Sequence, residues 1–162
     1  DITDNVIPYI PKEEEKVQRE AKKILGKFAR NAITPADFRV SCTCTRVPVL
    51  DGHTETVFVE TAEAAEPEDV KKEMLKFSKN VSIGKLPSAP KEYIVVHDDP
   101  TRPQPRIDRE LNDGMTTAVG RLRKDTAFDN GIKYVLLSHN EKMGSAKGAV
   151  LLAELLKDKQ IL

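Results

Sequence analysis

The chain has 162 residues, a length that suits one domain with a hydrophobic core. Lysine and arginine number 26 and aspartate and glutamate number 26, so there is neither the basic excess of a nucleic-acid-binding protein nor an acidic tail. No apolar run approaches the roughly 20 residues of a membrane span, and the first residues lack the basic and apolar regions of a signal peptide. We therefore expect a soluble, cytoplasmic protein whose partners include neither nucleic acid nor a membrane.

The first quarter of the chain predicts an apolar arm and a helix. Residues 5–10 form an apolar extended run of the kind that packs against a neighbouring surface. Pro11 suits the first turn of a helix, the glutamates after it complement the positive end of the helix dipole, and Gly26 marks the stop. Glu13 and Lys16 are three residues apart, so they lie on one face of this helix. On spacing alone, that face is an ordinary solvated surface.

A β-hairpin is predicted over residues 38–61. Two β-branched runs are joined through an Asp-Gly pair ending at Gly52, and such a pair favours a tight hairpin turn. Arg46 would then pair with Val57, and Arg46 and His53 would project from one face about 13 Å apart. An arginine fork and an imidazole at that separation could hold a small molecule that carries a carboxylate. The alternatives are a surface or ion-paired arginine and a turn histidine without a catalytic role.

Cys42 and Cys44 lie two residues apart on the first predicted strand. Residues at that spacing point the same way with about 6.6 Å between Cα atoms, the far end of what a disulfide allows. We therefore expect two reduced thiols. The three histidines are scattered along the chain, so the sequence shows no metal-binding pattern.

The rest of the chain interleaves helices and strands. A helix that begins near Glu66 carries an apolar stripe assigned to the core, formed by Val70, Met74, Leu75 and Phe77. A proline-rich stretch, Asp98–Arg109, suits neither helix nor central strand and is expected to be a long ordered loop or an arm between subunits. The other expected elements are strands at Tyr93–Val96, Gly114–Arg123 and Ile132–Ser138 and a helix at Val150–Leu156. This order predicts an α+β fold with helices on one face of a mixed or antiparallel sheet.

Residues 144–149, which open the last helix, are mostly small. Small residues at a helix N-terminus let a ligand approach the backbone amides closely, and they equally allow the helix to pack tightly against a neighbour. The sequence leaves both interpretations open.

Four segments together resemble the C-terminal half of the aspartate-semialdehyde dehydrogenases, in the form found in archaea and fungi. They are Asn5–Lys16, Arg46–Thr54, Gln104–Arg123 and Ser138–Gly148. The resemblance runs nearly end to end, and the Arg-Val-Pro-Val stretch followed by Gly-His is specific to that family and its near relatives. It implies the glyceraldehyde-3-phosphate-dehydrogenase-like fold of the family's C-terminal domain, which binds substrate and forms the dimer.

The resemblance also implies roles for four residues in the reduction of an acyl phosphate, which that family carries out with NADPH through a thioester on a cysteine. His53 matches the general acid/base, a task suited to a side chain of a type that titrates near neutrality. Arg46 matches the arginine that grips the substrate carboxylate with a bidentate fork. Glu13 matches the carboxylate that binds the substrate amino group, and Lys16 matches the lysine that meets the phosphate.

Asn140 and Gly144 resemble the family's approach to the nicotinamide end of NADP. The nucleophilic cysteine motif and the glycine-rich NADP loop of the family have no match in residues 1–162, and Cys42 and Cys44 stand where the family has no nucleophile. We therefore expect a C-terminal substrate-binding and dimerisation domain, with the NADP-binding domain and the nucleophile absent. NADP would belong to the full-length enzyme, and this chain alone should be inactive.

The function implied is a part in the NADPH-dependent reduction of aspartyl phosphate to aspartate semialdehyde, in the biosynthesis of lysine, methionine and threonine. A related reductase acting on N-acetyl-glutamyl phosphate is an alternative, against which Glu13, Lys16 and Arg46 argue. A non-catalytic oligomerisation domain is another. The apolar arm and the proline-rich loop would be awkward on the surface of a monomer, so we expect a homodimer or higher homo-oligomer.

Overall fold

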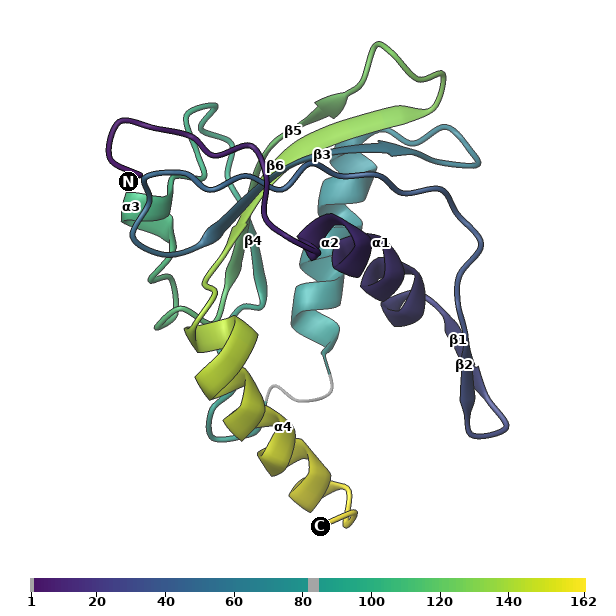
Figure 1. The fold of residues 1–162 in the computed structure, drawn as a ribbon. Helices are drawn as coiled ribbons and strands as arrows, with labels where there is room; N and C mark the ends of the chain where they lie inside the picture. The colour runs from purple at the N-terminus through teal and green to yellow at the C-terminus, as the bar shows by residue number, and fades with distance from the viewer. Residues whose placement is uncertain (1, 82–84) are drawn as a thin grey trace. The chain divides into compact units, whose positions relative to one another are not determined.

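The computed structural model describes residues 2–81 and 85–162. The chain folds as two compact units, Asp1–Val49 and Leu50–Leu162 (Figure 1). Within the described residues, no helix is both long enough and apolar enough to cross a membrane.

The first unit contains one helix and a small hairpin. The predicted helix is confirmed as α1, Glu13–Ile24, with glutamates in its first turn and lysines in its last. Beyond it, β1 (Lys27–Ala29) and β2 (Ala32–Thr34) pair antiparallel, although no strands were predicted there. The two connecting residues, Arg30 and Asn31, both have positive φ, as a tight hairpin turn requires. Because arginine is an unusual residue for that conformation, this turn could not be predicted from local residue preferences.

The predicted hairpin over residues 38–61 is wrong. Its first half has no regular secondary structure apart from one bridge, in which Arg46 pairs with Ile7 through backbone hydrogen bonds of 2.9 and 3.0 Å. Arg46 therefore does not pair with Val57. Pro48 lacks the N–H group that a strand in a hairpin ladder would need. The two cysteines lie on this irregular segment and not on a strand, and both are free thiols.

The second unit is built on a four-stranded mixed sheet in the order β3-β6-β5-β4. The strands are β3 (His53–Glu60), β4 (Ile94–Val96), β5 (Thr117–Lys124) and β6 (Gly131–Ser138). β6 pairs antiparallel with β3 and with β5, whereas β4 runs parallel to β5. All four strands were predicted from the sequence, but β3 has a partner far along the chain instead of its sequence neighbour.

Helix α2, Pro67–Asn80, packs on β4 and β5 (Figure 1). Most of its predicted apolar stripe is half-buried, whereas Phe77 is exposed and does not belong to the core. The buried Ser78 near the end of the helix accepts backbone hydrogen bonds from Tyr93 (2.9 Å) and Ile94 (3.0 Å). This hydroxyl fastens the helix directly to the start of β4.

The centre of the sheet supplies most of the core. The buried apolar residues are Met115, Ala118, Val119, Ile132, Leu137 and Leu151. Gly120 on β5 is also buried, because the carbonyl group of Arg102 lies over it. A Cβ at Gly120 would approach the Arg102 oxygen to 2.2 Å, so a side chain there would force the backbone of the neighbouring loop to move.

The proline-rich loop Asp98–Arg109 is ordered around the fully buried Asp108. The Asp108 carboxylate accepts a bidentate pair of hydrogen bonds from the Arg102 guanidinium and one from the Gln104 N–H at 2.6 Å. One turn of helix, α3 (Pro105–Asp108), forms within the loop, where the sequence predicted no helix. Proline is tolerated there because it occupies the first turn, whose N–H groups have no partner within the helix.

These contacts keep Asp108 ionised. Burial raises the pKa of the carboxyl, but the hydrogen bonds from Arg102 and Gln104 and the charges of Arg102 and His97 outweigh it, so the pKa lies below the ordinary value. His97 Nε2 lies 3.3 Å from Asp108 Oδ1 without forming a hydrogen bond to it. The loop is therefore organised by a buried charge whose partners surround it.

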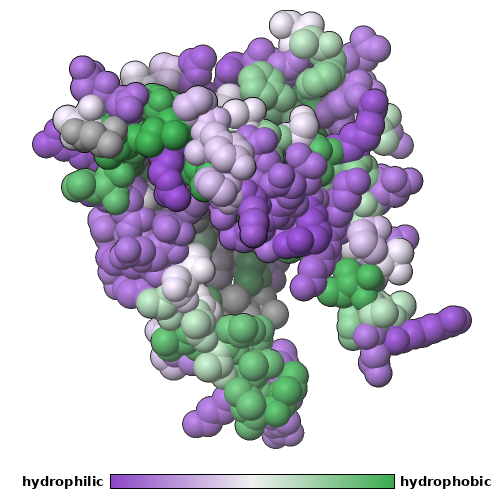
Figure 2. Space-filling model, in the orientation of Figure 1, coloured by the Kyte–Doolittle hydropathy of each residue, from purple (hydrophilic) through white to green (hydrophobic). Residues whose placement is uncertain are grey.

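The chain ends in a π-helical turn, η1 (Lys142–Ala146), followed by α4 (Lys147–Asp158). The predicted last helix is thus confirmed and begins earlier than the sequence indicated. Figure 2 shows apolar side chains gathered over the far end of α4, where Leu152, Ile161 and Leu162 are exposed.

Candidate functional site

Three of the predicted site residues lie at one end of the sheet in the second unit. His53 is the first residue of β3 and pairs with Ser138, the last residue of β6. Asn140 follows shortly after β6, and Gly144 lies in η1. All three predicted residues are exposed. The pairing of β3 with β6 therefore brings the predicted acid/base and the predicted cofactor contacts to the same end of the sheet.

The other three predicted residues belong to the first unit. Glu13 and Lys16 lie on one face of α1, as their spacing predicted, with Lys16 Nζ 3.6 Å from Glu13 Oε2. Their side chains are 39% and 49% exposed, so the pair adds little to stability and both groups can meet a ligand. Arg46 is exposed, and its backbone is held by Ile7. The expectation that Arg46 and His53 share one face of a hairpin fails with the hairpin itself.

Glu14 fastens α1 to the irregular segment that leads to Arg46. Its Oε1 accepts the Cys44 N–H at 3.0 Å, and the Cys42 thiol donates to the Glu14 carbonyl oxygen at 3.6 Å. Burial, followed by the neighbouring Cys42 and the carboxylates of Glu14 and Glu13, raises the pKa of Cys44. A raised pKa disfavours the thiolate, which is the form that a nucleophile needs.

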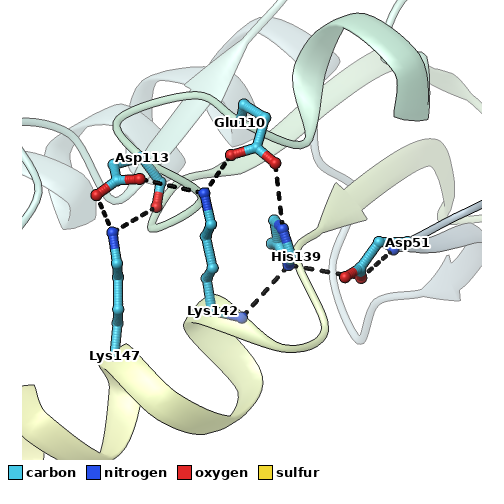
Figure 3. A network of polar contacts seen from close by, with 7 residues as sticks. Asp51, Glu110, Asp113, His139, Lys142 and Lys147 are labelled. Carbon is cyan, nitrogen blue, oxygen red and sulfur yellow. Dashed lines mark hydrogen bonds and ion pairs between the residues drawn. The ribbon is translucent and has the colours of Figure 1, made fainter.

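The second unit also contains a buried histidine that was not predicted from the sequence to be a site residue. His139 follows β6 directly, is only 5% exposed and has a carboxylate on either side (Figure 3). Asp51 Oδ1 is 3.5 Å from Nδ1, and Glu110 Oε1 is 3.4 Å from Nε2. The backbone N–H of Lys142 donates to Nδ1 at 3.3 Å. The spacing from His139 to Lys142 is that of a helix N-cap and its partner, the one signal in the sequence that could have revealed this contact.

Two lysines extend this network over the loop between α3 and β5. Lys142 pairs with Glu110 and, at 3.1 Å, with Asp113. Lys147 pairs with the same aspartate from the first turn of α4 (Figure 3). The hydrogen bond from Lys142 holds the pKa of Glu110 below its ordinary value. The start of the last helix is thus tied to the loop by charge as well as by the histidine.

A cleft of about 220 Å³ lies elsewhere on the second unit, between the start of α2 and the ends of β4 and β5. Its charged lining residues are Glu68, Asp98, Arg121 and Arg123, and His97 also lines it. It contains none of the predicted site residues, and its mixed charges select for neither sign of ligand. The cleft is therefore not the candidate site.

Residues 1–141 match the family described as "Semialdehyde dehydrogenase, dimerisation domain". This chain therefore belongs to the family of semialdehyde dehydrogenase dimerisation domains, as the resemblance in its sequence predicted.

Its relatives include aspartate-semialdehyde dehydrogenases from an archaeon and a fungus. The aspartate-semialdehyde dehydrogenase of Methanothermobacter thermautotrophicus is 45% identical over 97% of this chain and 45% of its own length. That of Candida albicans is 43% identical over 100% of this chain and 46% of its own length. The chain thus spans less than half the length of these relatives.

Solved structures confirm the fold. The structure of the Candida albicans enzyme with NADP matches with a TM-score of 0.88 and 43% identity. The match covers 100% of this chain and 47% of that structure's chain. Aspartate semialdehyde dehydrogenase II from Vibrio cholerae, at 28% identity over 95% of this chain and 41% of its own, has a TM-score of 0.73. The predicted α+β fold of the glyceraldehyde-3-phosphate-dehydrogenase-like type is therefore confirmed.

Proposed function

We propose that this chain is the C-terminal, substrate-binding and dimerisation part of a cytoplasmic aspartate-semialdehyde dehydrogenase. The reaction would be the NADPH-dependent reduction of aspartyl phosphate to aspartate semialdehyde, in the biosynthesis of lysine, methionine and threonine. The observation that carries the proposal is the pairing of β3 with β6, which brings His53 to the same sheet end as Asn140. The NADP-binding domain and the nucleophilic cysteine would lie in a part of the enzyme beyond residues 1–162.

The exposed surface at Asn140 and Gly144 suits the nicotinamide end of NADP. A Cβ at Gly144 would find only His139 O at 3.7 Å and Asn140 Oδ1 at 3.8 Å, so a flat ring can come close to the backbone here. The Asn140 amide offers both a donor and an acceptor, which match those of a carboxamide. When bound, NADPH would supply the hydride, and these two residues would hold its reacting end.

His53 would serve as the general acid/base. An imidazole can take the proton of an attacking thiol and handle a proton at the substrate carbonyl. Its position as the first residue of β3 supports this role, because the ladder with β6 fixes the backbone while the side chain stays exposed.

The exposed cations and carboxylate of the first unit fit the ends of aspartyl phosphate. The Arg46 guanidinium can bind a carboxylate through two parallel hydrogen bonds. Glu13 would accept from the substrate amino group, and Lys16 would meet the phosphate. Their ion pair on α1 supports the assignment, because it holds opposite charges at neighbouring positions for a substrate that itself carries both.

We also propose that the chain forms a homodimer, as expected of the dimerisation-domain family. β3 is an edge strand of eight residues, and its Phe58 is 55% exposed. A long edge strand with exposed apolar side chains is unusual on a monomer. Sedimentation at micromolar concentration should report a dimer, and a clean monomer would show that this part of the proposal is wrong.

The function can be tested by joining residues 1–162 to the part of the Methanothermobacter enzyme that lies outside the match. This chimera should oxidise NADPH with aspartyl phosphate and not with N-acetyl-glutamyl phosphate. The isolated chain is the matched control and should be inactive, because it has a base and a carboxylate clamp without the proposed nucleophile. Activity of the isolated chain, or a folded chimera that acts only on the acetylated substrate, would contradict the proposal.

A further inference from the structure

His139 closes the segment that carries both proposed cofactor contacts. Its carbonyl oxygen accepts the Gly144 N–H at 3.2 Å, and its Nδ1 accepts the Lys142 N–H at 3.3 Å. The segment from Asn140 to Gly144 is therefore bracketed by one residue that uses both backbone and side chain. The Gly144 bond spans five residues, as in a π-helical turn. The Lys142 N–H is one of the first N–H groups of the helical region, and the His139 side chain supplies the partner that such groups lack within a helix.

The direction of these hydrogen bonds assigns the tautomer of the ring. Since Nδ1 accepts from a backbone N–H, a neutral His139 carries its proton on Nε2, which faces Glu110 Oε1 at 3.4 Å. On the other side, Asp51 Oδ1 accepts the Gly52 N–H at 2.6 Å and lies 3.5 Å from Nδ1. The ring thus lies against the short turn that leads into His53.

The surroundings of the ring are shaped to hold it. Gly114 has a φ of +75°, and a Cβ there would come within 2.9 Å of His139 Cδ2 and 2.6 Å of Lys142 Cδ. Only glycine combines this backbone conformation with enough room for the imidazole. The ion pairs of Lys142 and Lys147 with the loop hold the helical side of the same site.

We propose that His139 is a positioning residue of the reductase, which fixes Asn140 and Gly144 for the nicotinamide end of the cofactor and supports the turn that presents His53. The inference rests on the proposed function for the chemistry, but its structural half can be measured in the isolated chain. His139 itself touches neither substrate nor cofactor.

Two variants distinguish the hydrogen bond of the His139 side chain to the Lys142 N–H from the space that its ring fills. His139→Phe keeps a ring of similar size but loses the ring's contacts with the Lys142 N–H and with Glu110. His139→Asn retains an oxygen that can accept the Lys142 N–H, as helix caps do. Amide hydrogen exchange at residues 142–146 should quicken about tenfold in His139→Phe while the β3–β6 ladder is unchanged, and His139→Asn should restore most of the protection. His97→Phe, which alters a half-buried histidine beside a different carboxylate, is the control and should leave the exchange rates of residues 142–146 unchanged.

The chimera described above then measures the functional half. His139→Phe should raise KM for NADPH about fivefold to tenfold with little change in KM for aspartyl phosphate, and His139→Asn should recover most of that loss. ¹⁵N spectra of the ring should show Nε2 as the protonated nitrogen in the neutral form.

Three results would overturn the inference. They are unchanged exchange at residues 142–146 in His139→Phe, equal rises of both KM values, and no recovery in His139→Asn. If His139→Phe unfolds the chain, Glu110→Gln tests the same contact from an exposed position and should produce a smaller rise of KM for NADPH alone. If the chimera is inactive but exchange at residues 142–146 quickens in His139→Phe as predicted, the proposed function is contradicted and the structural role of His139 is supported.

Discussion

The two units carry equal shares of the predicted site but are stabilised differently. None of residues 2–49 is buried, whereas the second unit contains every buried apolar side chain of the described residues. The proposed substrate-binding residues Glu13, Lys16 and Arg46 rest on one helix, one backbone bridge and the contacts of Glu14. The proposed acid/base and cofactor contacts rest on a sheet.

The sheet should hold the side chains of the second unit precisely, whereas those of the first unit should be the more adaptable. Hydrogen-bonded ladders over buried side chains open only with global unfolding, whereas exposed helices and isolated bridges open locally. Residues that grip a flexible substrate can tolerate such opening, while an acid/base must keep its position. Substitutions in the two units should therefore differ in the size and the reach of their effects.

His53→Ala in the chimera should lower kcat by about 10² to 10⁴, because no other side chain would replace the acid/base. Steady-state kinetics with saturating substrates measure it. The same replacement at His97, which lies outside the candidate site, should leave kcat nearly unchanged. If both variants behave alike, His53 has no catalytic role.

Asp108→Ala should destabilise the second unit by about 3 kcal/mol, since it leaves the Arg102 guanidinium and the Gln104 N–H without their buried partner. Urea unfolding followed by circular dichroism would detect the loss. Asp98→Ala is the matched control: this aspartate pairs with Lys71, but its side chain is 86% exposed, so little should change. Equal stability of the two variants would show that the loop does not depend on its buried charge.

The same carboxylate predicts the response to acid. The folded-state pKa of Asp108 is depressed below the ordinary value of 3.8, so its contribution to stability is present above that pH and is lost as the pH falls through the folded pKa. Stability measured from pH 5 downwards should fall less steeply in Asp108→Asn than in the unaltered chain. Parallel curves would contradict this.

Arg46→Lys should weaken transition-state binding in the chimera by about 1 to 3 kcal/mol although the charge is kept, because lysine cannot form the bidentate pair. The measured quantity is kcat/KM for aspartyl phosphate. Arg30→Lys, on an exposed turn of the same unit, is the control. If kcat/KM falls no more in Arg46→Lys than in the control, Arg46 is an ordinary surface arginine without a role in substrate binding.

Glu14→Ala should have the smallest effect: it should lower the stability of the first unit by about 1 kcal/mol and leave the second unit unchanged. Loss of the carboxylate frees the Cys44 N–H, so amide exchange at Cys44 and Arg46 should quicken. The sheet of the second unit should not respond. Glu15→Ala, one residue further along the helix and exposed, should change neither region.

Most elements could be predicted from the sequence because their signals are local. Each signal lies within a few residues of the structure that it specifies. Examples are the proline before α1, the glutamates of its first turn, the stop at Gly26, and the apolar runs of β5 and β6. The resemblance implied roles for six candidate residues, and the ladder of β3 with β6 brings three of them to one sheet end. Their roles remain predictions.

The partner of β3 could not be found in this way. Asp51-Gly52 carries a strong local turn signal, yet the side chain of Asp51 bonds the N–H of Gly52 and the strand pairs with distant β6. Strand pairing is decided by which surfaces can be buried together, and a local signal does not contain that information. The role of His139 could not be predicted for the same reason, because its carboxylate neighbours come from two separate loops.

Gly120 restricts which amino-acid substitutions this chain can accept. Strand positions usually accept many residues, but the carbonyl group of Arg102 occupies the space in which any Cβ at Gly120 would lie. In a saturation-mutagenesis map, Gly120 should therefore stand out as a position where even alanine is rejected, between neighbours that accept conservative changes. A compensating change would have to rebuild the backbone of the Asp108-centred loop, so strand and loop can change only together.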